Sequence, residues 1–201
     1  MNRLCSKLLM ALFLLFLCAC NNGNSTENKI SVAELTDREN AILSTTSDKS
    51  FVFDFELDDE YTKVSVWIEK YEAGELVDDQ LMELTSQVNK DGSIIFSNPK
   101  DSTREEYLPF YIGIGNDGSV ASISSYDNHV QDLEEMASVW GSFPEEITFE
   151  QEELLLAGIC YSDNENGISS LTTDFYQNPE GHISDLKDYN VVYLLKAKIN
   201  K

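Results

Sequence analysis

Residues 50–57 read SFVFDFEL, and every second position from 51 onward is Phe or Leu. Alternate side chains of a β-strand point to opposite faces, so this spacing predicts a strand with one aromatic face. Asp54 and Glu56 fall on the other face, which suits a strand that has only one side against a core. The residues expected to point inward are Phe51, Phe53, Phe55 and Leu57.

The next segment continues this period of two. Residues 62–72, TKVSVWIEKYE, alternate through two valines and an isoleucine and predict a second strand. Trp67 and Tyr71 fall on the opposite face of that strand. Exposed aromatic side chains can stack on a sugar or a peptide, but we interpret these two as the second half of a core.

Turn signals separate the remaining strands. Two polar turns that end in Asp-Gly, Asn89–Gly92 and Asn116–Gly118, are typical of tight β-hairpins. Short strands with such spacing predict a mainly β fold, namely an antiparallel β-sandwich or a partly closed barrel with one or two short helices. The other predicted strands are QLMELTSQV (80–88), SIIFS (93–97), LPFYIGIG (108–115), SVASISS (119–125), EITFEQ (146–151), LLLAGICYS (154–162) and NVVYLLKAKI (190–199).

Two segments depart from the strand pattern. Thr36 and Glu39 have the spacing of a capping box, which predicts a short helix at about residues 37–44. Apolar residues recur at helical spacing between Asn128 and Gly141, and this predicts a helix at about residues 129–140. The recurring residues are Val130, Leu133, Met136, Ala137 and Trp140.

The composition limits the partners of the chain. Its 201 residues suffice for one ordinary domain, and 36 acidic against 14 basic residues give a formal net charge of −22. Binding to a nucleic-acid backbone needs clustered Lys and Arg, so we expect no nucleic-acid partner. The same charge opposes adsorption of the chain to an anionic membrane surface.

The N-terminus has the layout of a signal peptide. Arg3 and Lys7 precede the apolar run LLMALFLLFLCA, residues 8–19. A lasting transmembrane anchor takes about 20 apolar residues, and this run is shorter. We therefore expect residues 1–19 to be cleaved from the protein.

The end of this run resembles the lipobox of bacterial lipoproteins. Leu17-Cys18-Ala19-Cys20 has the leucine, the small residue and the final cysteine of that box, and Cys18 does not fit because bulky Leu17 precedes it. The resemblance implies a diacylglycerol on the Cys20 sulfur, and hence a protein anchored by lipid to the cell membrane on its extracytoplasmic side. The alternative is an ordinary secretory signal with incidental cysteines.

The rest of the chain resembles small, uncharacterised lipoproteins of Gram-positive bacteria of the Bacillus type. The resemblance covers the lipobox and the stretches AILSTTSDKSFVFDF, VSVWIEKYE and DYNVVYLLKAKI, and it implies no particular activity. Residues 20–29 would then comprise the lipidated cysteine and a flexible polar spacer, and residues 30–201 a single mainly β extracytoplasmic domain.

Two short fragments resemble motifs of penicillin-binding enzymes. Ser97–Lys100 matches S-x-x-K and Ser162–Asn164 matches S-D-N. The mechanism needs the serine at the start of a helix, but Pro99 lies inside the first fragment, where a strand passes into a loop. No K-T-G follows the second fragment. We interpret both matches as coincidence and expect no catalytic residue there.

Signals for a metal or a cofactor are weak as well. His129 and His182 are the only histidines, and neither has a ligand-type neighbour at zinc spacing. Asp163–Gly167 partly resembles a calcium loop, and we interpret it as a polar turn between strands. Cys160 lies in an apolar run, which predicts a buried and inert thiol. We expect no metal and no cofactor.

These observations favour a binding protein over an enzyme. The acidic run from Glu145 to Glu153 could bind a cationic peptide or a cation, but such runs are more often the solvated face of a strand pair. We expect a non-enzymatic binding or interaction module that contacts the membrane through its lipid and binds an unknown envelope ligand or protein. The alternative is an envelope hydrolase, or a modulator of one, that acts on peptidoglycan or peptide.

Overall fold

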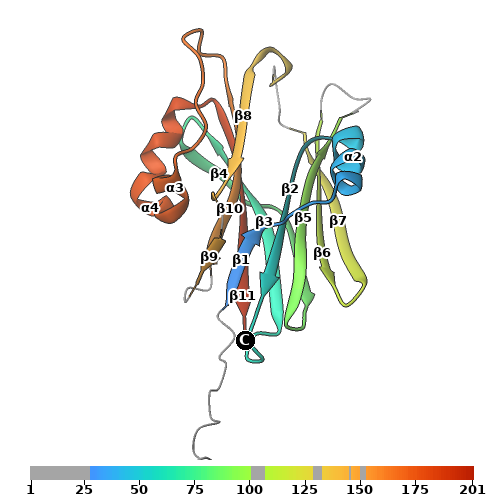
Figure 1. The fold of residues 1–201 in the computed structure, drawn as a ribbon. Helices are drawn as coiled ribbons and strands as arrows, with labels where there is room; N and C mark the ends of the chain where they lie inside the picture. Colours follow the sequence, from blue (N-terminus) through green and yellow to red (C-terminus); the bar gives the residue numbers. More distant parts are fainter. Residues whose placement is uncertain (1–27, 101–106, 129–132, 145, 150–152) are drawn as a thin grey trace, which may run out of the picture.

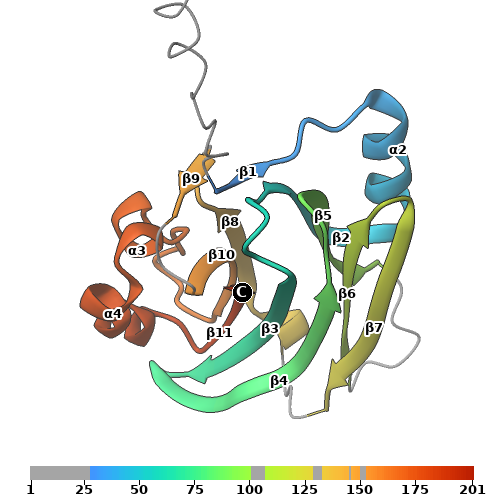
Figure 2. The same ribbon diagram turned by 90° about the horizontal axis from the view of Figure 1, so that it is seen from below.

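The chain folds into two facing antiparallel β-sheets (Figures 1 and 2). The computed structural model describes residues 28–100, 107–128, 133–144, 146–149 and 153–201. Within these residues one sheet has six strands and the other has five. The prediction of a mainly β sandwich is confirmed.

The six-stranded sheet has the order β7-β6-β5-β2-β1-β9, and all its neighbouring strands pair antiparallel. It contains the predicted aromatic strand, which lies between a long neighbour and the short first strand. Its members are β1 (Lys29–Val32), β2 (Ser47–Glu56), β5 (Asp91–Pro99), β6 (Leu108–Asn116), β7 (Ser119–Asp127) and β9 (Glu146–Thr148).

The five-stranded sheet has the order β4-β3-β11-β10-β8, also antiparallel throughout. Of its three central strands, β3 and β10 are buried on both faces along nearly their whole length, and β11 along its first half. Its members are β3 (Lys63–Glu72), β4 (Glu75–Gln87), β8 (Ala137–Ser142), β10 (Glu153–Ser162) and β11 (Val191–Asn200).

Short helices lie outside the two sheets. The predicted capping box is present, because Thr36 accepts from the Glu39 backbone N–H while the Glu39 carboxylate accepts from the Thr36 N–H, and the helix that follows is α2 (Asp37–Thr46). The other helical segments are α3 (Thr173–Gln177), α4 (Pro179–His182) and 3₁₀ helices at Leu133–Glu135 and Ile183–Asp188.

The core lies between the sheets, as the sequence pattern predicts. Phe53 and Phe55 are fully buried, and Phe51 is partly buried beside them. Phe53 stacks on Phe143 of the β8–β9 connection, with ring centroids 5.3 Å apart. On the opposite face of β3, Trp67 and Tyr71 are also buried, which confirms that they belong to a second part of the core and are not an exposed stacking platform.

The outer face of the five-stranded sheet is covered in part by the segment that leads into α3. Gly158 of β10 lies against this segment, where an added Cβ would stand 2.6 Å from the Leu171 Cδ1 atom. A side chain at position 158 would therefore push the segment away. This close approach explains how β10 is buried on both faces.

One of the two predicted hairpins is correct. Asn116–Gly118 joins β6 to β7, and Asp117 and Gly118 have φ values of 52° and 72°, as a tight hairpin turn requires. Asn89–Gly92 does not form a hairpin, because β4 and β5 belong to different sheets. This turn carries the chain from one sheet to the other. The Asp-Gly sequence alone does not distinguish a hairpin turn from a connection between sheets.

The predicted helix at residues 129–140 is wrong over the part that the structure describes. Residues 133–135 form a single 3₁₀ turn, and Ala137–Ser142 form strand β8, which pairs with β10. Residues 129–132 lie outside the described residues. Backbone pairing with a buried strand outweighs the helical spacing of the apolar residues here.

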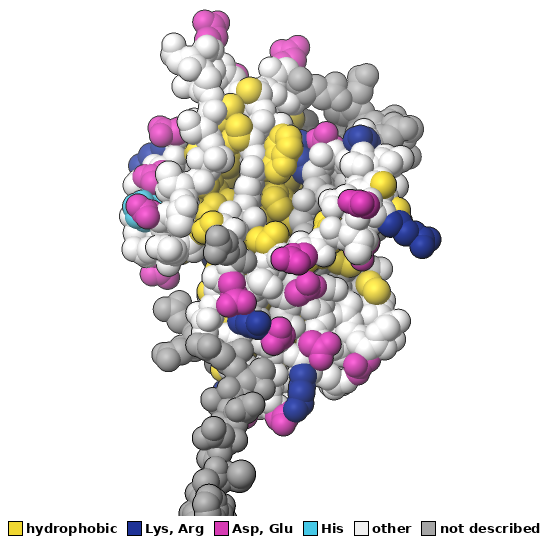
Figure 3. Space-filling model, in the orientation of Figure 1, with side chains coloured by type: hydrophobic (Ala, Val, Ile, Leu, Met, Phe, Trp, Pro, Cys, Tyr) yellow, Lys and Arg dark blue, Asp and Glu magenta, His cyan; other side chains and the backbone are white. Residues whose placement is uncertain are grey.

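The sandwich does not close into a barrel. Trp140 pairs with Ile159 and so lies on the core-facing side of β8, yet 49% of its surface is exposed. In Figure 3, hydrophobic side chains gather in a hollow between β8 and β2. Lys49 of β2 lies at this open side, with its Nζ 5.0 Å from the Trp140 ring centroid and 5.5 Å from that of Tyr161.

A buried ion pair connects the two sheets elsewhere in the core. Lys70 of β3 and Asp127 of β7 lie 2.7 Å apart, with side chains 4% and 2% exposed, and the Tyr193 hydroxyl donates to the same carboxylate at 2.8 Å. Burial lowers the pKa of Lys70, but hydrogen bonds to Asp127 and Glu72 outweigh this and hold it above its ordinary value. Burial and the Asp127 charge also raise the pKa of Tyr193.

We predict that Phe53→Ala lowers the free energy of unfolding by about 3–5 kcal/mol, because a fully buried ring would leave a cavity. Denaturant unfolding of residues 28–201 measures this loss. The control is Val120→Ala on β7, where the side chain is 63% exposed and the expected change is small. An unchanged midpoint for Phe53→Ala would show that the aromatic face does not form the core.

We predict that Asp127→Asn lowers the free energy of unfolding by about 3–5 kcal/mol, because it leaves the Lys70 charge buried without this partner. The triple variant Lys70→Met, Asp127→Leu, Tyr193→Phe removes both buried charges and the hydroxyl that donates to Asp127, and it should be more stable than Asp127→Asn. Denaturant unfolding compares the two. A triple variant less stable than the single one would contradict the charge argument.

Candidate functional site

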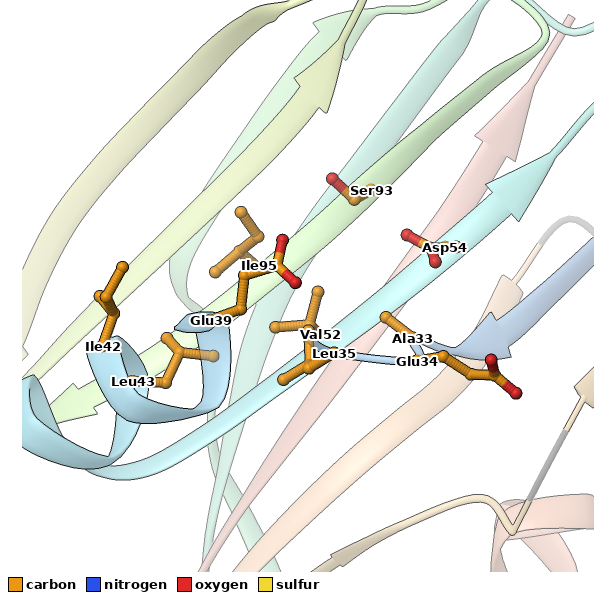
Figure 4. A pocket seen from close by; sticks show the side chains of 10 residues that line it. All are labelled: Ala33, Glu34, Leu35, Glu39, Ile42, Leu43, Val52, Asp54, Ser93 and Ile95. Carbon is orange, nitrogen blue, oxygen red and sulfur yellow. The ribbon is translucent and has the colours of Figure 1, made fainter. Parts of the chain in front are cut away.

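A groove lies between α2 and the outer face of the six-stranded sheet (Figure 4). Its volume is about 300 Å³, at the small end of ligand sites. Its walls come from the helix, from strands β2 and β5, and from the segment that joins β1 to α2. The lining residues are Ala33, Glu34, Leu35, Glu39, Ile42, Leu43, Val52, Asp54, Ser93 and Ile95.

The groove exists because α2 does not pack closely on the sheet. None of the ten residues of the helix is buried, and Ile42 is 53% exposed. The capping box stabilises the start of the helix locally, and Lys100, just after β5, bonds the Ser44 and Thr46 carbonyls near its end. Apolar side chains of helix and sheet therefore face each other across an open space.

The apolar floor of the groove comes from both sides of this space. Val52 of β2 and Ile95 of β5 are paired neighbours on the outer face of the sheet. Leu43 of the helix and Leu35 of the preceding segment are likewise only partly buried. An apolar group placed between them would remove surface from water on both sides.

Two carboxylates give the groove its charge. Hydrogen bonds from the Thr36 side chain and backbone hold the pKa of Glu39 below its ordinary value, so this carboxylate is ionised. Partial burial, and then the charge of Glu39, raise the pKa of Asp54. In Figure 4 the Glu39 side chain lies beside Ile95, and the side chain of Glu34 extends away from the other labelled residues.

The groove offers apolar and acidic groups to a ligand. Its ten lining residues include no Lys, Arg, His or Cys, and Ser93 supplies the only hydroxyl group among their side chains. No base of the histidine or lysine type is present among them to activate that serine. The arrangement can bind a ligand by apolar contact and by negative charge.

A second and larger hollow, of about 850 Å³, lies beside the buried ion pair. Lys70, Glu72 and Asp127 line it, together with apolar residues of β4 such as Val77 and Leu81. The Lys70 ammonium contacts both Asp127 and Glu72 at 2.7 Å. Lys70 compensates part of the acidic charge of this hollow, whose lining also includes Asp78, whereas the α2 groove has no cation among its lining residues.

The structure separates the two fragments that match penicillin-binding motifs. Ser97 lies within β5, and Pro99 ends that strand, as expected for a strand that passes into a loop. Ser162 ends β10 in the other sheet. Ser97 therefore does not begin a helix, and Lys100 bonds to the end of α2 instead. The strand-to-loop placement of the first fragment is as predicted, and its interpretation as a coincidence stays a prediction.

The residues considered for a metal do not come together in the described part of the chain. His182 ends α4, with its Nδ1 3.3 Å from Asp185, and His129 lies outside the described residues. Asp163–Gly167 is a polar turn, as predicted, in which the Asn164 carbonyl accepts from the Gly167 N–H, but it leads from β10 to α3 and not to another strand. Among the described residues no cluster of three or more metal-ligating side chains occurs.

Of the two cysteines considered for a role, Cys160 lies within the described residues and Cys20 does not. Cys160 is buried in β10, and burial raises its pKa to about 12, which confirms the prediction of an inert thiol. Cys20, the predicted site of lipid attachment, lies outside the described residues, as do residues 1–19. In the part of the chain that is described, no helix has the length and apolar character needed to cross a bilayer.

The acidic run forms ion pairs where it is described. Glu146 lies 3.5 Å from Lys29 of β1, and Glu153 lies 3.0 Å from Lys196 of β11. Both carboxylates are about half exposed, which fits a solvated strand face. Glu145, Glu150 and Glu152 lie outside the described residues.

The sequence pattern did not identify the groove residues as a site. The sequence pattern predicts Asp54 on the outer face of its strand and Glu39 in the capping box, and both predictions are correct. These residues line one groove only because α2 lies over the outer face of the six-stranded sheet. The available signal was the apolar pair Ile42 and Leu43 on a short, capped helix directly before the aromatic strand.

The comparison with known proteins matches this fold to one family. No curated protein and no solved structure matches the chain. The family model of the YgaN domain matches residues 29–199, from the start of β1 to near the end of β11. The match thus covers most of the chain and both sheets. The chain belongs to the YgaN domain family.

Proposed function

We propose that this protein is a lipid-anchored, extracytoplasmic binding module of the cell envelope and that it is not an enzyme. The observation that carries the binding function is the groove beneath α2, which is apolar, negatively charged and open to solvent. The lipobox at Leu17–Cys20 supports the anchor and its side of the membrane. Its partners would be the membrane, through the lipid, and an envelope ligand or protein.

The position of the first strand suits such an anchor. β1 begins at Lys29, nine residues after Cys20. A flexible polar spacer of that length has a typical reach of about 16 Å. A domain attached in this way would stand just clear of the bilayer, with its groove accessible to ligands in the envelope.

The charge of the domain supports lipid as the main attachment. The net charge of −22 for the whole chain becomes −24 when Arg3 and Lys7 leave with residues 1–19, and this charge repels anionic headgroups. Figure 3 shows acidic side chains distributed over the visible face. Acyl chains on one cysteine would hold the protein at the membrane in spite of this repulsion. The same charge argues against a nucleic-acid partner.

The prediction for the anchor concerns Cys20. Labelled palmitate fed to bacteria that produce the protein should enter the wild-type chain and the control variant Cys18→Ser, but not Cys20→Ser, because only Cys20 has the lipobox position. Gel fluorography or click labelling after immunoprecipitation measures incorporation. Label that persists in Cys20→Ser would contradict the assignment.

The prediction for the alternative, an envelope hydrolase, concerns Ser97. A fluorescent penicillin should label neither the wild-type protein nor Ser97→Ala, because Ser97 lies in a strand and shares no helical turn with Lys100. A penicillin-binding protein treated in the same way provides the positive control. Stoichiometric labelling that disappears in Ser97→Ala would make this protein an enzyme and overturn the proposed binding function.

A further inference from the structure

We propose that the groove beneath α2 binds a lysine side chain of a peptide partner, with the alkyl stem between helix and sheet and the ammonium group at Glu39 and Asp54. This inference rests on the proposed binding function and names the ligand class of the same groove. It is argued from the shape of the groove, from its apolar walls and from its charge.

The shape of the groove favours a side chain over a large ligand. Its volume of about 300 Å³ is at the lower limit of the range for small-molecule sites. It is open along one side, between a helix and a sheet face that do not close on each other (Figure 4). A side chain that projects from a peptide could enter from that side while the peptide backbone stays outside.

The apolar walls suit an unbranched alkyl stem. Leu43 of the helix faces Val52 and Ile95 of the sheet across the groove. Lysine commonly buries its four methylene groups against apolar surface while its ammonium group reaches polar partners. The stem would fill the space that keeps α2 away from the sheet, and burial of this surface would favour binding.

The charge of the groove complements an ammonium group. Glu39 and Asp54 line the same space, and the ten lining residues include no basic side chain. Asp54 forms no ion pair with any other residue of the described chain. The Glu39 charge makes ionisation of Asp54 less favourable, and a bound cation would reverse that effect. An anionic ligand would meet two carboxylates and should be excluded.

A divalent metal ion is a less suitable occupant of this groove. Among the described residues no group of three or more potential metal-ligating side chains is found, here or elsewhere. The floor is apolar and offers few oxygen ligands for a hydrated ion. The combination of an apolar stem and a single positive charge fits both features of the groove.

The experiment uses the whole chain, purified in detergent and labelled at its Ile, Leu and Val methyl groups for NMR. The probes are three capped amino acids with similar stems: Nα-acetyl-lysine N-methylamide, its Nε-acetylated form, and Nα-acetyl-norleucine N-methylamide. The first should shift the methyl signals of Leu43, Val52 and Ile95 in a saturable way. The two uncharged probes should bind at least about fivefold more weakly, the factor that an exposed ion pair of about 1 kcal/mol represents.

Matched variants locate the charge effect. Asp54→Asn and Glu39→Gln should each weaken binding of the lysine probe severalfold, and Gln at position 39 can still complete the capping box. Asp79→Asn makes the same change of charge on β4 of the other sheet, where Asp79 is exposed, and should leave binding unchanged. Methyl signals away from the groove show whether each variant remains folded.

Two results would overturn the inference. Equal binding of the three probes would show an apolar groove without preference for a cation, and no saturable shift with the lysine probe would show that the groove does not take this side chain. Neither result affects the assignment of the lipid anchor, which palmitate labelling of Cys20 tests separately. The inference is supported if the lysine probe binds in a saturable way and if Asp54→Asn and Glu39→Gln each weaken that binding.

Discussion

The packing of the two sheets depends on one constraint. The polar groups buried between the sheets must form hydrogen bonds or ion pairs with one another. Lys70 and Asp127 come from different sheets and are almost fully buried, and Tyr193 donates to the same carboxylate. Such a pair adds little net stability, but either charge left alone in the core is strongly unfavourable. Arrangements that slide or separate the sheets would break this contact. The aromatic core supplies the stabilising energy, and the ion pair penalises alternative placements of one sheet on the other.

The sequence predicts those features of the fold that depend on residues close together in the chain. The inward face of SFVFDFEL, the capping box at Thr36 and the turn at Asp117 follow from the spacing of neighbouring residues, and the structure confirms them. The errors concern partners that are distant in sequence. The apolar residues near Trp140 have helical spacing, but pairing with β10 makes this segment a strand. The turn at Asn89–Gly92 has a hairpin sequence and yet joins two sheets.

The candidate site was not predictable for the same reason. The sequence pattern predicts correct local roles for its two central carboxylates, with Glu39 in a cap and Asp54 on the outer face of a strand. The groove arises only when α2 lies over β2 and β5, and no spacing within a single segment encodes that placement. Lys70 and Asp127 are 57 positions apart in the sequence, and nothing in either local stretch indicates that they meet. Site residues on the outer face of a sheet also look like ordinary solvated positions.

The helix that covers the groove is itself only weakly held. An isolated helix of ten residues is marginal in water, and most helices in proteins are stabilised by an apolar face packed on a core. α2 has no buried residue, so its stability comes from the capping box, from the bonds of Lys100 to its last turn and from its connection to β1 and β2. A ligand in the groove would give the apolar side of α2 the packing partner that the sheet alone does not supply. Binding and the order of this helix should therefore be coupled, while the two sheets remain unchanged.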